Sequence, residues 1–184
     1  MKIFLISGLS RHGKDTIGNF IEKYCEENNI KFCRTQIAKY LKMYIKDYFG
    51  WDGKEETKPR TLLQELGTDV IRGKLNKPYF FADRTKEDLE ILSNFFDVAA
   101  VTDIREPLEI ETIRNSFSDV VVIRVNRINY ESEMTLEQQK HKIENAMNDY
   151  SDYDYVLTND TLEQLEKDVI EVLKKEGLTN EKND

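Results

Sequence analysis

Apolar runs of strand length alternate along this chain with amphipathic stretches of helix length. Residues 98–101 and 120–123 are continuous apolar runs within the segments 97–103 and 119–125, which is typical of strands buried on both faces of a parallel sheet. Regular alternation of strands and helices predicts one α/β domain with a doubly wound parallel sheet. The predicted strands cover residues 2–7, 31–37, 97–103, 119–125 and 153–160.

Two of the predicted helices begin at recognisable signals. Pro107 suits the first turn of a helix between the third and fourth strands. Thr85 and Asp88 are spaced like a relaxed capping box. Residues 126–152 are polar and carry one short predicted helix. The other predicted helices cover residues 16–27, 39–49, 60–72, 85–95 and 161–175.

The segment GLSRHGKDT, residues 8–16, joins the first strand to the first helix. Gly8, Gly13 and Lys14 fit the G-x-x-x-x-G-K pattern of a phosphate-binding loop. Glycines let backbone amides point inward around phosphate oxygens, and the helix N-terminus adds positive potential. The alternative is a glycine-rich turn before a surface helix, but the position between strand and helix favours a nucleotide phosphate site.

Asp15 stands where this loop usually has a Ser or Thr. A carboxylate in contact with a triphosphate would be repelled by roughly 1–4 kcal/mol. Mg²⁺ between the two would make the contact favourable, because this ion prefers hard oxygen ligands. We therefore interpret Asp15 as a residue that faces the metal, directly or through water. The alternative is a helix N-terminal carboxylate stabilised by the dipole alone.

A second candidate element is VAAVTDIR, which ends the predicted strand at 97–103. Asp103 would lie at the carboxyl end of a buried strand, where it could hold Mg²⁺ through water or orient the acceptor. Arg105 could bind a phosphate with two parallel hydrogen bonds. A salt-bridged pair of loop residues is the alternative.

Basic residues in the polar segments form a third element. Arg124 and Arg127 flank the start of residues 126–152, as expected of a lid that closes over phosphates. Any one of these basic residues, taken alone, could be a solvated surface charge. We expect at least two of the residues named in this paragraph to contact phosphate. Three more lie between the second and third predicted strands, where an acceptor pocket would be inserted: Lys42, Arg60 and Arg72.

Composition excludes several classes of function. The 184 residues carry a formal net charge of -8, which argues against broad binding of nucleic acid or anionic membranes. Cys25 and Cys33 lack metal-ligand or redox spacing, so we expect reduced thiols. His141 and Glu144 have no third ligand nearby for zinc. The first seven residues are too short for a signal peptide, and we expect a cytoplasmic protein.

With these motifs assembled, the chain resembles the P-loop kinases of the nucleoside monophosphate kinase type. More narrowly, it is similar to phage and bacterial deoxynucleoside monophosphate kinases, which carry G-x-x-x-S-G-K-D-T; here His12 replaces the serine. The likeness continues through LLQELGTDVIR, VTDIREPLEIETIR and HKIENAMNDYSDYDYVLTND, and so covers nearly the whole chain. Animal-type phosphomevalonate kinases share the G-K-D start, and dephospho-CoA kinases share only the general layout.

The resemblance implies a three-layer P-loop kinase fold, with about five parallel strands and helices on both faces. It divides the domain into a core (1–38, 96–125 and 153–176), an acceptor-binding insertion (about 39–95) and a lid (about 126–152). It also implies site residues. For ATP and Mg²⁺ these are Gly8, Ser10, Arg11, His12, Gly13, Lys14, Asp15 and Thr16, with Asp15 and Asp103 facing the metal. For catalysis they are Lys14, Asp15, Asp103, Arg105 and Arg127, and for the acceptor Lys42, Gln64, Arg72 and Arg105.

The expected function is transfer of a phosphoryl group from ATP to a small phosphorylated acceptor, foremost a deoxynucleoside monophosphate. A kinase for phosphomevalonate or dephospho-CoA, or a P-loop protein that binds nucleotide without turnover, are the alternatives. A GTPase would need N-K-x-D, and the sequence has none. Neither nucleic acid nor membrane is an expected partner, and a monomer and a homodimer both remain open.

Overall fold

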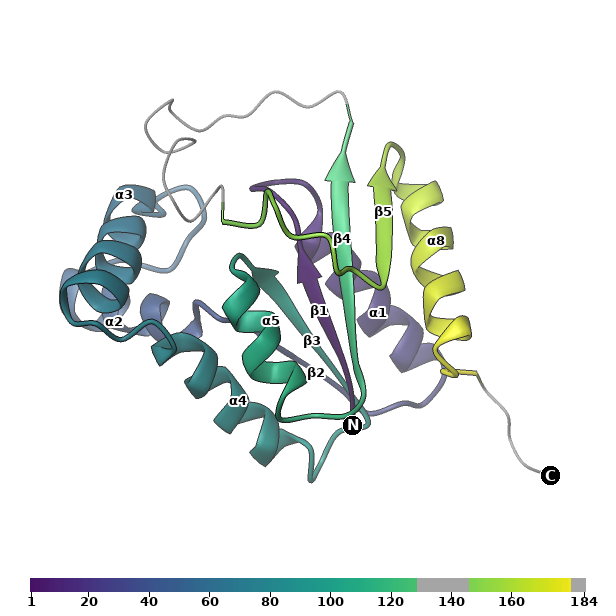
Figure 1. Ribbon diagram of the computed structural model, residues 1–184. Coiled ribbons are helices and arrows are strands. Elements are labelled where there is room, and N and C mark those ends of the chain that lie inside the picture. Colours follow the sequence, from purple (N-terminus) through teal and green to yellow (C-terminus); the bar gives the residue numbers. More distant parts are fainter. Residues whose placement is uncertain (129–145, 180–184) are drawn as a thin grey trace.

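A sheet of five parallel strands forms the centre of the computed structural model, which describes residues 1–128 and 146–179 (Figure 1). The strand order is β2-β3-β1-β4-β5, so the first strand lies in the middle of the sheet. All five predicted strands are present, and the predicted parallel α/β class is confirmed. The strands are β1 (Lys2–Ser7), β2 (Phe32–Thr35), β3 (Val98–Ile104), β4 (Val120–Arg127) and β5 (Tyr155–Asn159).

The helices lie between the strands, largely where the sequence predicts them. One begins at Pro107, as expected, and the Thr161 hydroxyl caps another by accepting a hydrogen bond from the Gln164 amide at 3.2 Å. The described helices are α1 (Lys14–Glu27), α2 (Lys39–Phe49), α3 (Arg60–Gln64), the π-helix η1 (Glu65–Lys74), α4 (Phe80–Leu92), α5 (Pro107–Arg114) and α8 (Leu162–Lys175).

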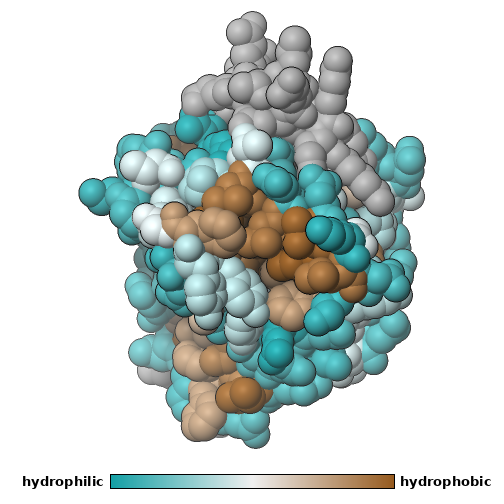
Figure 2. Space-filling model, turned by 90° about the vertical axis from the view of Figure 1, so that its left-hand side faces the viewer, coloured by the Kyte–Doolittle hydropathy of each residue, from teal (hydrophilic) through white to brown (hydrophobic). Residues whose placement is uncertain are grey.

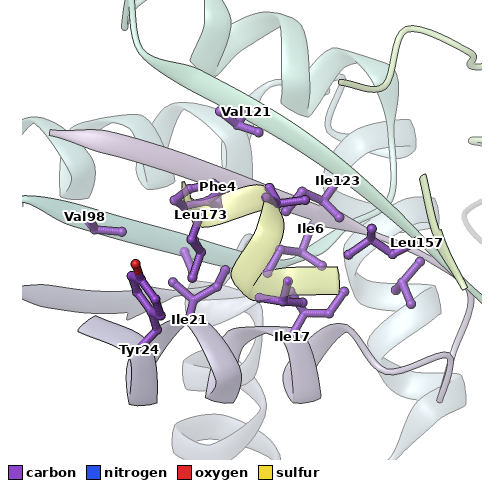
Figure 3. Close-up of a cluster of buried hydrophobic side chains, with 14 of the residues drawn as sticks. Phe4, Ile6, Ile17, Ile21, Tyr24, Val98, Val121, Ile123, Leu157 and Leu173 are labelled. Carbon is purple, nitrogen blue, oxygen red and sulfur yellow. The ribbon is translucent and has the colours of Figure 1, made fainter. Parts of the chain in front are cut away.

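Side chains of β1 point alternately to the two faces of the sheet and take part in two separate cores. Phe4 and Ile6 pack with α1 and α8 on one face (Figure 3). Ile3 and Leu5 pack with α2, α4 and α5 on the other. All four side chains are fully buried. Because successive side chains of a strand point to opposite faces, helices pack on both sides of the sheet. The result is the three-layer arrangement of helices, sheet and helices that the resemblance implies.

The predicted helix at 85–95 is wrong at both ends, because α4 runs from Phe80 to Leu92. Thr85 lies inside the helix and is buried, so it is not a cap. Asp88 accepts hydrogen bonds from Lys39 Nζ (2.7 Å) and the Tyr40 hydroxyl (2.8 Å) of α2. Contacts with α2, which local spacing does not contain, therefore determine where Asp88 lies.

The predicted helix at 60–72 is continuous, but its winding changes from α to π after Gln64. A Cβ on Gly67 would lie 2.9 Å from Leu41 Cδ2, so this glycine allows the π-helix to approach α2 closely. Figure 2 looks onto the side of the molecule where α2 and α3 lie, and it shows hydrophobic side chains gathered within a largely hydrophilic face. This group of helices forms the wall of the site described below.

Part of the predicted lid lies outside the described residues. Its short helix, with His141 and Glu144, falls within 129–145, which the structure does not describe. The structure describes the chain again from residue 146. Just before β5, both Asp152 and Asp154 pair with Arg114 of α5, the latter at 2.9 Å. In the described parts of the chain no helix is long and apolar enough to cross a bilayer.

Two leucines of α8 provide a direct test of this packing. Leu165 is fully buried in the core beneath the sheet, whereas Leu162, one turn earlier, is 59% exposed. We expect Leu165→Ala to lower the free energy of unfolding by about 2–5 kcal/mol and Leu162→Ala by less than about 0.5 kcal/mol. Urea denaturation measures both. Equal losses in the two variants would contradict the packing of α8 against the sheet.

Candidate active site

Close contacts with two strands require glycine at both ends of the phosphate-loop segment. A Cβ on Gly8 would lie 2.7 Å from the Val125 carbonyl oxygen of β4. Gly13 has φ +110°, and a Cβ there would lie 2.6 Å from Asn159 Nδ2 of β5. The same Asn159 amide donates to the His12 carbonyl at 2.9 Å. The loop is thus seated on the carboxyl ends of β4 and β5, directly before α1.

Lys14 lies across the inside of this loop. Its Nζ donates to the carbonyl oxygens of Gly8 (2.7 Å) and Leu9 (2.8 Å), and the residue is buried. A lysine at the first position of a helix, held over a loop of backbone amides, is placed to meet an anion at that helix end. The geometry fits the phosphate-loop interpretation of the sequence.

His12 connects the loop to the end of β4. Its Nδ1 accepts a hydrogen bond from the Arg127 amide at 3.1 Å, and the ring also hydrogen-bonds the Val125 backbone. Burial, then the charges of Lys14 and Arg124, lower the pKa of His12 below its usual value of 6.5. The ring is therefore neutral at physiological pH, as an acceptor at Nδ1 requires.

A cavity of about 240 Å³ opens between the loop, the start of α2 and the helices α3 and η1. Basic side chains on its wall outnumber acidic ones, although the whole chain is acidic. Such an excess of positive charge suits a ligand with several phosphates. The basic residues are Arg11, Lys14, Lys42, Lys58, Arg60, Arg72 and Arg105; the acidic ones are Asp15, Glu55, Asp103 and Glu109.

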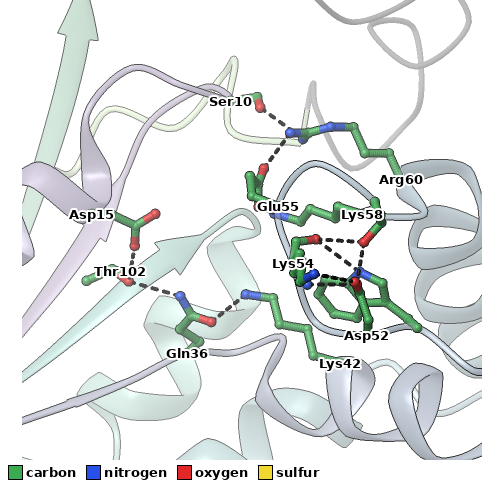
Figure 4. A network of polar contacts seen from close by, with 12 residues as sticks. Ser10, Asp15, Gln36, Lys42, Asp52, Lys54, Glu55, Lys58, Arg60 and Thr102 are labelled. Atoms are coloured by element: carbon green, nitrogen blue, oxygen red, sulfur yellow. Dashed lines mark hydrogen bonds and ion pairs between the residues drawn. The ribbon is translucent and has the colours of Figure 1, made fainter.

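A chain of hydrogen bonds crosses the floor of the cavity (Figure 4). The Thr102 hydroxyl donates to Asp15 Oδ1 at 2.9 Å, and Gln36 Nε2 lies 3.5 Å from the same hydroxyl. Lys42 Nζ donates to the Gln36 side-chain oxygen. Burial lowers the pKa of Lys42, and Asp103 opposes that shift. These contacts fix one oxygen of Asp15 and place the ammonium of Lys42 on the opposite wall.

Asp103 holds the start of α2 in place. Its Oδ1 accepts a hydrogen bond from the Ile37 amide at 2.6 Å, and its Oδ2 accepts one from the Ala38 amide at 3.0 Å. Both residues precede α2, which carries Lys42. Asp103 lines the cavity at the carboxyl end of β3, and both of its oxygens have backbone partners.

The polar segment at 50–59 reaches across to the phosphate loop. Arg60 Nη2 pairs with Glu55 Oε1 at 2.6 Å, and its Nη1 lies 3.5 Å from Ser10 Oγ (Figure 4). Lys58 pairs with the same carboxylate at 2.9 Å. Sequence reasoning missed Glu55 and Lys58, because a turn-rich charged segment carries no motif.

Arg72 lies between two carboxylates at the start of α5, one from its N-cap residue Glu106 and one from Glu109. Its Nε is 2.7 Å from Glu106 Oε2, and its Nη2 is 2.8 Å from Glu109 Oε1. The guanidinium also stacks 4.9 Å from the centre of the Phe81 ring. Burial raises the pKa of Glu109 to about 7 even though Arg72 opposes the shift. Sequence reasoning missed Glu109, although E-P-L-E is the capping-box signal that the structure contains.

The structure brings most of the predicted site residues to one cavity. His12 belongs to the loop and Arg127 lies against it, but neither lines the cavity, and Gly8, Gly13 and Thr16 do not line it either. In the described ranges no cluster of three His, Cys, Asp or Glu side chains could hold a metal alone. The predicted residues on the wall are Ser10, Arg11, Lys14, Asp15, Lys42, Gln64, Arg72, Asp103 and Arg105.

The pKa of His12 leads to a prediction about stability. The folded protein holds this proton less tightly than the unfolded chain does. The stabilisation by the neutral ring is therefore complete above about pH 6.5 and is lost as pH falls through the lower folded-state pKa. We expect the difference in unfolding free energy between wild type and His12→Gln to be constant from about pH 7 to 8 and to shrink toward about pH 5. A difference independent of pH would contradict the lowering of the His12 pKa by burial and by the charges of Lys14 and Arg124.

Solved structures of small-molecule kinases share this fold. An APS kinase of Mycobacterium tuberculosis matches with a TM-score of 0.55 and 13% identity, covering 94% of this chain and 96% of its own. A sugar kinase of Janibacter sp. HTCC2649 matches with a TM-score of 0.56 and 12% identity, covering 98% and 96%. A shikimate kinase of Aquifex aeolicus matches with a TM-score of 0.50 and 17% identity, covering 97% and 99%. These likenesses confirm the P-loop kinase fold.

Among curated proteins, no sequence matches this chain. The family model of deoxynucleotide monophosphate kinases matches residues 45–169, well over half of the chain. The resemblance inferred from the motifs is thereby confirmed. The chain belongs to the deoxynucleotide monophosphate kinase family and is an ATP-dependent phosphotransferase that acts on a small phosphorylated acceptor.

Proposed function

We propose that this enzyme transfers the γ-phosphoryl group of ATP to a deoxynucleoside monophosphate and releases the diphosphate, with Mg²⁺ as its metal ion. The observation that carries the proposal is the excess of basic side chains on one cavity wall in an acidic chain. Those cations come both from the phosphate loop and from the segment between β2 and β3, so two phosphorylated ligands can meet there.

On the ATP side, the amides of residues 8–16 and Lys14 would hold the β- and γ-phosphates. Support comes from the left-handed backbone at Arg11 and Gly13, which curls the loop, and from the position of Lys14 at the start of α1. His12 and Arg127 would act from outside the cavity. They would fix the loop and the start of the proposed lid (about 126–152) relative to each other.

Asp15 suits the role of metal-facing carboxylate. It lies on the first turn of α1 at the cavity wall, with one oxygen fixed by Thr102. Mg²⁺ commonly takes one or two carboxylates together with substrate phosphates and water, so a larger cluster of acids is not required. Asp103 would contribute through water, because both of its oxygens accept backbone amides. When bound, the ion would neutralise charge on the transferring phosphoryl group.

On the acceptor side, Lys42, Gln64 and Arg105 would contact the monophosphate, in the proposed insertion (about 39–95) and beside it. Leu41 and Phe81 supply an apolar part of the wall for the nucleoside. No side-chain nucleophile is needed, since an acceptor phosphate oxygen attacks the γ-phosphorus directly. Catalysis would then rest on positioning and on charge stabilisation by the surrounding cations.

The acceptor is identified by coupled measurement of ADP release from ATP with single acceptors. The panel contains the four deoxynucleoside monophosphates, the ribonucleoside monophosphates, dephospho-CoA and phosphomevalonate. We expect at least one deoxynucleoside monophosphate to give the highest kcat/KM, and Lys14→Ala to reduce that rate by at least about 100-fold. Stimulation only by another acceptor, or near-wild-type turnover of Lys14→Ala, would contradict the proposal.

Substitution of Asp15 tests the metal assignment. Asp15→Asn keeps an oxygen for Thr102 but removes the charge, so the Mg²⁺ concentration for half-maximal rate should rise by about tenfold or more while kcat falls. Asp83→Asn is the matched control, because Asp83 is an exposed acid in the first turn of α4. Unchanged Mg²⁺ dependence in Asp15→Asn would leave Asp15 as a helix-dipole residue.

A further inference from the structure

Glu109 is a buried carboxylate in the cavity wall with two different sets of partners. Its Oε1 pairs with Arg72 Nη2 of η1 at 2.8 Å. Its Oε2 accepts hydrogen bonds from the backbone amides of Arg105 (2.8 Å) and Glu106 (3.1 Å). One side chain therefore joins the segment between β2 and β3 to the loop that follows β3.

The partners of Arg72 decide what that residue can do. Nη2 donates a hydrogen bond to Glu109, whereas Nε forms an ion pair with Glu106 at 2.7 Å without hydrogen-bond geometry. Nη1 lies 3.4 Å from the Gly67 carbonyl, and the face of the guanidinium stacks on Phe81. An arginine held on these sides is suited to fixing the wall rather than to following an acceptor phosphate. The sequence-based role of Arg72 as a direct acceptor contact is therefore the weaker interpretation.

We propose that Glu109 is a positioning residue for phosphoryl transfer, which couples the acceptor-binding segment to Arg105 by holding Arg72 with one oxygen and the Arg105 backbone with the other. The proposal rests on the proposed function above, in which Arg105 contacts the acceptor. A displacement of about 1 Å at such a residue can reduce a rate about 100-fold. Glu109 itself touches no reacting atom.

A carboxylate is required at this position because both of its oxygens must accept hydrogen bonds. In Glu109→Gln the carboxamide has one acceptor and one donor, so a donor faces either the Arg72 guanidinium or the two backbone amides. An ordinary capping box would need only the backbone side. Glutamine can therefore replace Glu109 in a capping box, but it cannot accept hydrogen bonds on both sides and so disrupts the coupling.

The decisive experiment compares steady-state kinetics of wild type, Glu109→Gln and Glu111→Gln on the acceptor that the panel selects. Glu111 lies exposed on the same helix and controls for the change in net charge. We expect Glu109→Gln to lower kcat by about 10- to 100-fold while the KM for ATP stays within about twofold, and Glu111→Gln to match wild type. A kcat of Glu109→Gln within about twofold of wild type would overturn the proposal.

The pH profile separates coupling from simple capping. The charged groups that act on Glu109 are Arg72 of η1, Glu106 at the N-cap of α5 and Asp103 at the end of β3. Because burial raises the pKa of Glu109 to about 7, the ratio of wild-type to Glu109→Gln kcat should rise with pH through this value as the carboxylate ionises. Ionisation of the acceptor phosphate affects both proteins alike and cancels in this ratio. An identical profile in both proteins counts against the proposal.

Two further variants keep the test valid if Glu109→Gln fails to fold. Glu109→Asp retains the charge but is too short to reach both partners, so its kcat should fall while ATP binding persists; a wild-type kcat would overturn the proposal. Arg72→Met removes the other half of the contact. The double variant Glu109→Gln/Arg72→Met should have a kcat no lower than that of the more severe single variant. If the two fold-losses in kcat multiply in the double variant, the two residues do not act through the same contact.

The outcomes distinguish this proposal from the proposed function. If wild type uses none of the deoxynucleoside monophosphates, the proposed substrate class is wrong. The role of Glu109 is then tested by the same ratio of variant to wild-type kcat on whichever acceptor the panel finds.

Discussion

Seven basic side chains line one cavity, and the repulsion among them is the constraint on which the rest of this structure depends. Like charges at such spacing repel one another, more strongly as burial lowers the local dielectric. Carboxylates from separate elements balance part of that repulsion: Glu55 pairs with Arg60, Glu109 with Arg72, and Asp103 lies near Lys42. The remaining positive charge is what a phosphate-rich ligand neutralises.

The fold meets this constraint by bringing several strand ends together. β1 lies between β3 and β4, so the phosphate loop after β1 is adjacent to the ends of both neighbours. Asp103 at the end of β3 holds the start of α2, and Asn159 of β5 holds the loop. Polar contacts at the sheet edge thus determine the positions of the phosphate loop, which carries Arg11 and Lys14, and of α2, which carries Lys42.

Features encoded within one segment were predictable, and those created by contacts between segments were not. The strands, the phosphate loop and the helix at Pro107 follow from local pattern. Thr85 imitates a cap, yet it is buried inside α4 because Phe81 and Leu89 pack into the core around it. Glu109 belongs to a local capping-box pattern, and only its contact with Arg72, distant in sequence, joins it to the segment between β2 and β3. The local sequence contains no pattern that predicts the π-helical winding of η1.

The central claim is that two phosphorylated ligands meet in this one cavity. The most direct measurement is a crystal structure with a bisubstrate analogue in which adenosine and a deoxynucleoside are joined through a chain of phosphates. We expect the phosphate chain to run from the loop at Gly8 and Lys14 to Lys42 and Arg105, with the deoxynucleoside against Leu41 and Phe81. Density for the deoxynucleoside outside this cavity, with the adenosine phosphates still in the loop, would contradict the account.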